Sequence, residues 1–277
     1  YASVKNSTLK GMDNIIETIH FGLRKGFNQL KQFENSFSGI ENQMTEYLLT
    51  VFVGIELNAF PFPIRHAKVK LEYPLWQFYT KAFPFVKWNM ETIFETSYIK
   101  REYKKKRTKQ RIDIVILGQD NQDNERSYHA IELKAINTNN TGITNDLQRL
   151  SDSMITNDVS DHNSIQSCYF GCIKAYKQGF KPINKDELER IRNEKIQEIE
   201  SLIDINYKQE QKYSSLEYTV HHKDIDSVST EDFLKSYEGI RDEFGEQVTP
   251  YYSDAISETG EVLGIVIEIK RKSDSNG

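Results

Sequence analysis

Two β-prone runs separated by a short polar stretch constrain the fold of this chain more than any other feature. They span Ile112–Leu117 and Tyr128–Ile136, and the connection from Gly118 to Ser127 has the composition of a hairpin loop. A third run, Thr96–Tyr103, precedes them, while a helical stripe and a further apolar run, Gln166–Tyr176, follow. The succession strand, strand, strand, helix, strand predicts an α/β fold with a mixed β-sheet flanked by helices.

Helical patterns lie on both sides of these runs. Apolar residues at three- and four-residue steps predict an amphipathic helix over about residues 12–37. The capping pattern Ser38–Glu41 predicts the start of a second helix, which is apolar nearly all round and which we therefore expect to be buried. A stripe from Ile143 to Met154 predicts the helix before the fourth strand, and a capping pattern at Asn184 predicts a long charged helix.

The C-terminal part of the chain adds a predicted strand, a helix and a last strand, at about residues 216–220, 231–240 and 262–269. No internal repeat or low-complexity linker interrupts the chain. We therefore expect a single domain over residues 1–277. Its parts are a core at 38–176, an N-terminal helical segment at 12–37 and a C-terminal elaboration, itself α+β, at 184–270.

The composition favours a folded chain without a membrane segment. Of the 277 residues, 38% are hydrophobic and 12% aromatic, which is enough to build a core. No window reaches the roughly 20 apolar residues of a transmembrane helix, and no signal-peptide pattern is visible. We expect a cytoplasmic location and no membrane partner. The net charge of −5 confines any nucleic-acid-binding charge to a local groove.

The two cysteines, Cys168 and Cys172, lie four residues apart in one apolar run. On a strand that spacing separates them by about 13 Å, whereas a disulfide needs Cα atoms within about 7 Å. We therefore expect both to be buried small hydrophobic residues.

The residues that carry chemistry lie on the two central runs. Glu132 and Lys134 are two positions apart, so on a strand their side chains point to the same side. Asp113 can sit beside Glu132 if the two strands pair as a hairpin. Converging carboxylates repel each other unless a cation neutralises them, which indicates an all-oxygen Mg²⁺ site with Lys134 positioning water or stabilising phosphoryl charge. The alternative is a surface hairpin with alternating charges.

The pattern Asp113…Glu132-x-Lys134 resembles that of the PD-(D/E)XK nucleases, with Ile112 in place of the proline. The resemblance covers residues 38–176 and implies a restriction-endonuclease-like fold, endonuclease activity, and Mg²⁺ as cofactor, for which Mn²⁺ can substitute. It also implies DNA rather than RNA as substrate and a role in restriction or antiviral defence. The alternative function is a non-catalytic nucleic-acid-binding or assembly module that keeps a nuclease-like fold.

The same resemblance suggests further site residues. Family members often add a carboxylate from an N-terminal helix, and Glu46 is the candidate here for a third metal ligand and catalytic acid. Glu46 can instead lie at the edge of its apolar stripe and reach solvent, and Glu72 is the second choice. In the helix after the motif, Gln148 resembles a polar residue that some members direct at the site, although an exposed glutamine is favoured.

A basic stretch immediately precedes Asp113. Residues 100–111 hold eight Lys or Arg against one Glu. We expect nucleic-acid backbone contacts from Lys104, Lys105, Lys106 and Arg107, the alternative being a solvated hairpin tip. The long charged helix is expected to be a solvated face, and the C-terminal elaboration is the expected surface for a protein partner or a second copy of the chain.

A second Glu-x-Lys pattern occurs at Glu268 and Lys270, with Asp254 before it. No helix and strand follow it to complete a core, so we interpret it as charge on an edge strand. No Gly-rich run ends in Gly-Lys-Ser/Thr, which argues against a P-loop. The polar run His221–Asp224 lacks the spacing of a phospholipase-D-type motif and is interpreted as a strand end.

Overall fold

The computed structural model describes residues 14–34, 42–83, 110–155, 163–176, 182–241, 244–248 and 259–272. Its centre is a six-stranded sheet in the order β1-β2-β3-β4-β6-β5. The strands are β1 (Lys68–Pro74), β2 (Arg111–Gln119), β3 (Glu125–Leu133), β4 (Ser167–Tyr176), β5 (Leu216–Asp224) and β6 (Glu261–Arg271). The helices are α1 (Ile15–Glu34), α2 (Asn42–Ala59), α3 (Leu75–Ala82), α5 (Asn140–Ile155), α6 (Lys185–Ile203) and α7 (Thr230–Ser236).

The sheet is mixed but mostly antiparallel. Only β3 and β4 run parallel, and every other neighbouring pair is antiparallel. A parallel pair needs a crossover connection, and α5 supplies it between β3 and β4. The predicted α/β architecture of a mixed sheet flanked by helices is therefore confirmed.

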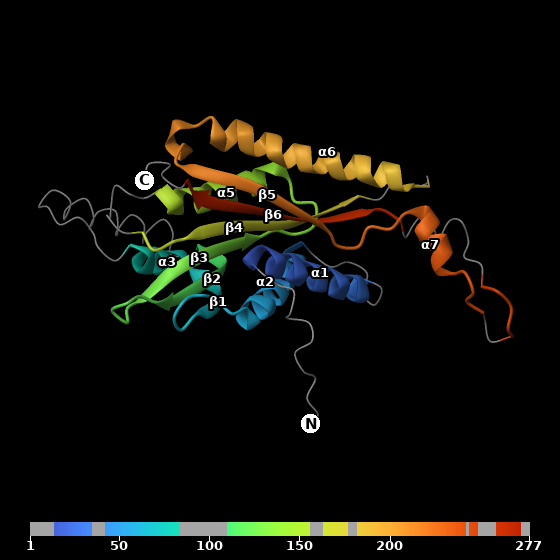
Figure 1. Cartoon of the computed structure of the whole chain (residues 1–277), viewed down its shortest axis with the longest axis horizontal. Coiled ribbons are helices and arrows are strands. Elements are labelled where there is room, and N and C mark those ends of the chain that lie inside the picture. The colour runs from blue at the N-terminus through green and yellow to red at the C-terminus, as the bar shows by residue number, and fades with distance from the viewer. Residues whose placement is uncertain are drawn as a thin grey trace, which may run out of the picture.

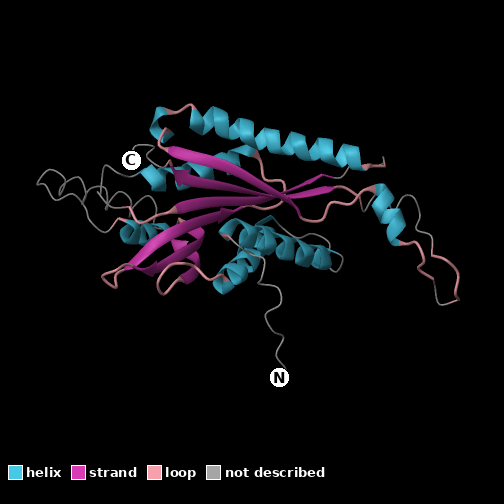
Figure 2. Ribbon diagram, in the orientation of Figure 1, coloured by secondary structure: helices cyan, strands magenta, loops and turns pink. Residues whose placement is uncertain are grey.

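Helices cover both faces of the sheet (Figures 1 and 2). On one face α1 and α2 pack in a cluster that includes Ile19, Leu23, Leu49, Val53, Ile131 and Tyr169. On the other face α3, α5 and α6 pack in a cluster that includes Phe78, Leu147, Leu150, Phe170, Leu202 and Ile267. The strands therefore bury side chains on both faces, which explains why β4 and β6 are continuous apolar runs in the sequence.

Helices α1 and α2 cross in close contact. A Cβ atom added to Gly22 of α1 would lie 2.5 Å from the Cα atom of Val53 in α2. Gly22 therefore allows the two helix backbones to approach each other more closely than a residue with a side chain would. This pairing fixes α2, which carries Glu46, against the sheet.

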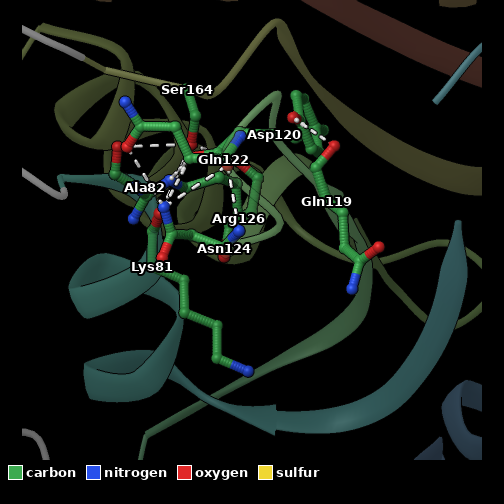
Figure 3. A network of polar contacts seen from close by, with 10 residues as sticks. Lys81, Ala82, Gln119, Asp120, Gln122, Asn124, Arg126 and Ser164 are labelled. Atoms are coloured by element: carbon green, nitrogen blue, oxygen red, sulfur yellow. Dashed lines mark hydrogen bonds and ion pairs between the residues drawn. The ribbon is translucent and has the colours of Figure 1, made fainter. Parts of the chain in front are cut away.

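The hairpin between β2 and β3 is closed by side chains in its loop (Figure 3). One carboxylate oxygen of Asp120 accepts hydrogen bonds from the backbone N–H groups of Gln122 and Asn124, at 2.8 and 2.9 Å. The other accepts from Nε of Arg126 at 2.8 Å. These contacts satisfy the polar groups of the loop and hold the register of the two strands. The predicted hairpin connection is confirmed.

Several sequence predictions are wrong or incomplete. The predicted strand Thr96–Tyr103 lies outside the described residues and stays a prediction, and the described sheet begins with β1, which is not among the predicted strands. Residues 68–73 alternate strictly between polar and apolar, which is a strand signal, but as an edge strand β1 is only partly covered and Glu72 interrupts it with a positive φ of 49°. The edge-strand interpretation of Glu268 and Lys270 is also wrong, because β6 lies inside the sheet between β4 and β5.

Helix α2 is not buried all round. Tyr47 is 58% exposed and Ile55 is 55% exposed, since the helix packs on α1 and the sheet through one side only. The predicted capping pattern at Ser38–Glu41 falls outside the described residues.

Other local predictions are confirmed. Cys168 and Cys172 are free and buried in β4. The side chain of Asn184 accepts a hydrogen bond from the backbone N–H of Glu187 at 2.8 Å and so caps α6. Among the described helices, none has the length and hydrophobicity that crossing a membrane would require.

Candidate active site

Strands β2 and β3 bring Asp113 and Glu132 to the same end of the sheet. Ile114 pairs with Ile131, and Asp113 and Glu132 occupy the next position outward on each strand. The backbone N–H of Leu133 donates to Oδ2 of Asp113 at 2.7 Å, which orients that carboxylate. The hairpin pairing expected from the sequence therefore places the two acidic residues side by side.

Lys134 follows the last residue of β3 and joins the two helical layers. Its backbone N–H donates to the carbonyl of Gly171 at 2.9 Å, so the chain still runs along β4 at this point. Its Nζ donates to Oε1 of Glu46 on α2 at 3.0 Å and lies 3.0 Å from Oδ2 of Asp146 on α5. These helices cover opposite faces of the sheet, so Lys134 connects both layers where the strand ends.

Arg149 of α5 supplies a second cation. Its Nη2 atom lies 2.8 Å from Oε1 of Glu132 and 2.8 Å from Oδ1 of Asp146. Glu132 is 1% exposed, whereas the side chain of Arg149 is 22% exposed. The guanidinium therefore reaches from the surface to a fully buried carboxylate.

Six residues make up what we call the carboxylate cluster: Asp113, Glu132, Glu46, Asp146, Lys134 and Arg149. They come from β2, β3, the residue after β3, and helices α2 and α5. When all are ionised, four carboxylates face two cations, and two negative charges remain uncompensated. The cluster thus has a net negative charge in a largely buried position.

Burial, with a smaller contribution from this excess charge, raises the pKa values of Asp113 and Glu132. Burial raises the pKa of Asp113 to about 6, although the hydrogen bond from Leu133 opposes the shift. Burial, followed by the charge of Asp113, raises the pKa of Glu132 well above its usual range. Both carboxyl groups therefore hold their protons more tightly than exposed ones, and a nearby cation would favour their ionised forms.

The pKa of Lys134 is raised above its ordinary value. Burial alone would lower it, but the nearby carboxylates of Asp146 and Glu46 outweigh burial. Lys134 is consequently a cation throughout the physiological range. It can donate hydrogen bonds and stabilise negative charge, but it cannot accept a proton.

The donor set of the cluster fits a divalent cation in chemistry and charge. Its free acceptors are carboxylate oxygens, which Mg²⁺ prefers, and the excess of two negative charges matches one such ion. Among the described residues, however, no group of three or more His, Cys, Asp or Glu side chains is arranged to hold a metal ion as it stands. Three of the four carboxylates contact Lys134 or Arg149 instead, so a metal bound by them would require these cations to move; they are Glu46, Asp146 and Glu132.

The other predicted site residues have different outcomes. Glu46 contacts Lys134 and its side chain is 32% exposed, so it both joins the cluster and reaches solvent. The carbonyl of Glu72 accepts a hydrogen bond from Arg111 at 2.7 Å, with no contact between its carboxylate and the cluster among the described interactions. Gln148 is exposed, as favoured. The basic residues 104–107 lie outside the described part of the chain.

Asp146 and Arg149 are cluster members that the sequence reasoning missed. Both lie on α5, where Asp146 adjoins the apolar stripe of Ile143, Leu147 and Leu150 and is 5% exposed. A carboxylate on a core-facing stripe, with an arginine three residues later, is the signal that could have found them, because such a group needs a partner.

The second Glu-x-Lys pattern has different surroundings. Glu268 is 7% exposed, with Nζ of Lys270 at 2.8 Å and Nε2 of His221 at 3.4 Å from its carboxylate oxygens. It lies opposite Tyr169 of β4, and Asp254 is outside the described residues.

Comparison of the whole chain with models of known protein families, with curated proteins and with solved structures finds no match.

Proposed function

We propose that the chain is a metal-dependent nuclease of the PD-(D/E)XK type, which hydrolyses phosphodiester bonds. The observation that carries the proposal is the convergence of Asp113 and Glu132 at the end of neighbouring strands, with Lys134 beside them. The element order α2, β1, α3, β2, β3, α5, β4, in which α3 is an addition between the first two strands, also supports a restriction-endonuclease-like core. The substrate we propose is DNA in preference to RNA, in restriction or antiviral defence, on the strength of the family resemblance.

The proposed roles follow from the charges in the cluster. Asp113 and Glu132 would hold Mg²⁺, with Glu46 as a further candidate once Lys134 releases it. When bound, Mg²⁺ would supply charge neutralisation at the phosphodiester and a more acidic water. Lys134 stays protonated because its pKa is raised, so its role is to donate a hydrogen bond to the attacking water or to a phosphoryl oxygen.

The test is cleavage of labelled DNA and RNA panels with Mg²⁺ or Mn²⁺. We expect Lys134→Ala and Asp113→Asn to lower the cleavage rate by about 100-fold or more, the usual effect of removing a transition-state contact. Lys270→Ala is the matched control, because it removes the lysine of the other Glu-x-Lys pattern, and it should cleave at the wild-type rate. No cleavage of any substrate, or cleavage undiminished in the two site variants, would refute the proposal.

The ion pairs of Lys134 and Arg149 favour a second candidate function. They compensate the carboxylates without a metal, as expected of a non-catalytic binding or assembly module that keeps a nuclease-like fold. Calorimetric titration with Mg²⁺ and Mn²⁺ distinguishes the two. Metal binding that disappears in Glu132→Gln supports the nuclease, whereas no binding to the wild-type protein supports the module.

A further inference from the structure

Arg149 holds an unusual position between two carboxylates. A single nitrogen, Nη2, donates to Oδ1 of Asp146 and lies 2.8 Å from Oε1 of Glu132. Arginine pairs most strongly with a carboxylate through two parallel hydrogen bonds. Here the same nitrogen serves both carboxylates, so the guanidinium compensates the charge of Glu132 without forming a two-point pair with it.

Three buried polar atoms of the cluster lack a hydrogen bond of good geometry among the described residues, although two of them lie within 3.0 Å of a cation. They are Oε1 of Glu132, Oδ2 of Asp146 and Nε of Arg149. Buried polar atoms are nearly always hydrogen-bonded, and leaving them unsatisfied is costly. Of the three, Nε of Arg149 has no close partner among the described residues, so the contacts of this guanidinium with the two carboxylates run through Nη2.

We propose that Arg149 is an exchangeable counter-ion of the metal site. In the metal-free protein its guanidinium compensates Glu132, and a divalent cation binding to Asp113 and Glu132 displaces it. The proposal rests on the proposed function, since it assumes that these carboxylates bind a metal. It goes beyond that function because it makes metal affinity depend on a helix residue outside the Asp…Glu-x-Lys pattern.

Two observations support displacement. A guanidinium 2.8 Å from the carboxylate of Glu132 and a divalent cation on the same carboxylate would repel each other strongly in a buried site. The side chain of Arg149 is also 22% exposed, so it has a route to solvent that fully buried Glu132 lacks. Occupation by Arg149 should therefore weaken metal binding, because the ion must first break two ion pairs.

The test is calorimetric titration with Mn²⁺, comparing the wild type with Arg149→Gln. Without the competing cation we expect the variant to bind Mn²⁺ about tenfold more tightly, a typical size for coupling between two ligands. The titration is best done at alkaline pH, where protons compete least for the carboxylates.

Arg192→Gln is the matched control. Arg192 of α6 lies 2.8 Å from Oε1 of Glu261, which is 1% exposed, so it also pairs with a fully buried glutamate. This variant leaves a buried carboxylate without its arginine on a different part of the sheet, and it should bind Mn²⁺ as the wild type does.

A measurement on the wild-type protein covers the case in which Arg149→Gln does not fold. Mn²⁺ should speed modification of Arg149 by an arginine-specific dicarbonyl reagent, located by mass spectrometry, while Arg192 reacts at an unchanged rate. The inference is overturned if the wild type binds Mn²⁺ and Arg149→Gln binds it equally or more weakly. It is also overturned if Mn²⁺ binds without changing the reactivity of Arg149. Either result leaves the nuclease proposal standing. No Mn²⁺ binding by either protein refutes the metal site itself.

Discussion

Replacing Asp113 by Asn should stabilise the metal-free protein at neutral pH. The substitution keeps the shape of the side chain, and the amide oxygen can still accept the hydrogen bond from the backbone N–H of Leu133. It removes the negative charge beside Glu132. In the wild type this charge contributes to the raised pKa of Glu132. A residue that we propose as a metal ligand is thus expected to lower the stability of the metal-free fold.

The size of the effect follows from the pKa of Asp113. Burial raises that pKa from 3.8 to about 6, so the folded state binds the proton more tightly than the unfolded state does. The folded protein therefore loses stability as the pH rises from the lower value to the higher one, and the loss is complete above both. Two pKa units correspond to about 3 kcal/mol, which is the largest gain that Asp113→Asn can bring through this residue's own charge.

Urea unfolding of both proteins in EDTA, at about pH 8 and about pH 4, measures this gain. The variant should be the more stable at the higher pH, and the difference should shrink at the lower pH, where the folded wild-type residue is already protonated. Equal stability at the higher pH, or a difference that does not depend on pH, would refute this account of the electrostatics.

Two further predictions concern the packing of α1. Gly22→Ala should destabilise the protein by about 1–3 kcal/mol in urea unfolding, because the added Cβ would meet the backbone of Val53. A stability equal to that of the wild type would contradict the close crossing of the two helices. His20→Leu should stabilise it by about 1–3 kcal/mol at neutral pH, because both ring nitrogens of His20 are buried without a partner among the described residues. Burial lowers the pKa of His20 to about 4, so the wild type loses stability as the pH falls below about 6.5. The stability gained by His20→Leu should therefore grow as the pH falls. A gain that does not depend on pH would contradict the lowered pKa of His20.

The sequence predicts the centre of the site well because its geometry is local. Glu132 and Lys134 share a side through strand alternation, and Asp113 reaches them through a short hairpin whose loop residues are polar. Both relations depend only on spacing along neighbouring strands, which a sequence displays directly. The choice of Glu46 needed the family resemblance, and its contact with Lys134, which joins residues from different layers, is not among the predictions.

Other parts of the structure depend on packing that spacing does not reveal. The contacts of Asp146 and Arg149 require the rotation of α5 on the sheet, which is set by the whole apolar stripe. The position of β6 inside the sheet depends on which strands are free to pair with it. An apolar run has the same sequence pattern whether the strand lies at the edge of a sheet or in its middle. Strand β1 is different, because residues 68–73 alternate between polar and apolar and the sequence therefore carries a signal that could have found it.

The position of β6 also has a consequence for how the chain folds during synthesis. Strands β1 to β4 can pair with neighbours that leave the ribosome soon after one another, but β4 has an open edge until β6 emerges much later and pairs along its whole length. Such an apolar edge can pair with other chains in the meantime. Strand β5 has to wait as well, because its partner in the sheet is β6. Because β6 lies between β4 and β5, the sheet cannot be completed until this last strand has been synthesised. A ribosome that pauses before β6 would therefore leave an aggregation-prone intermediate.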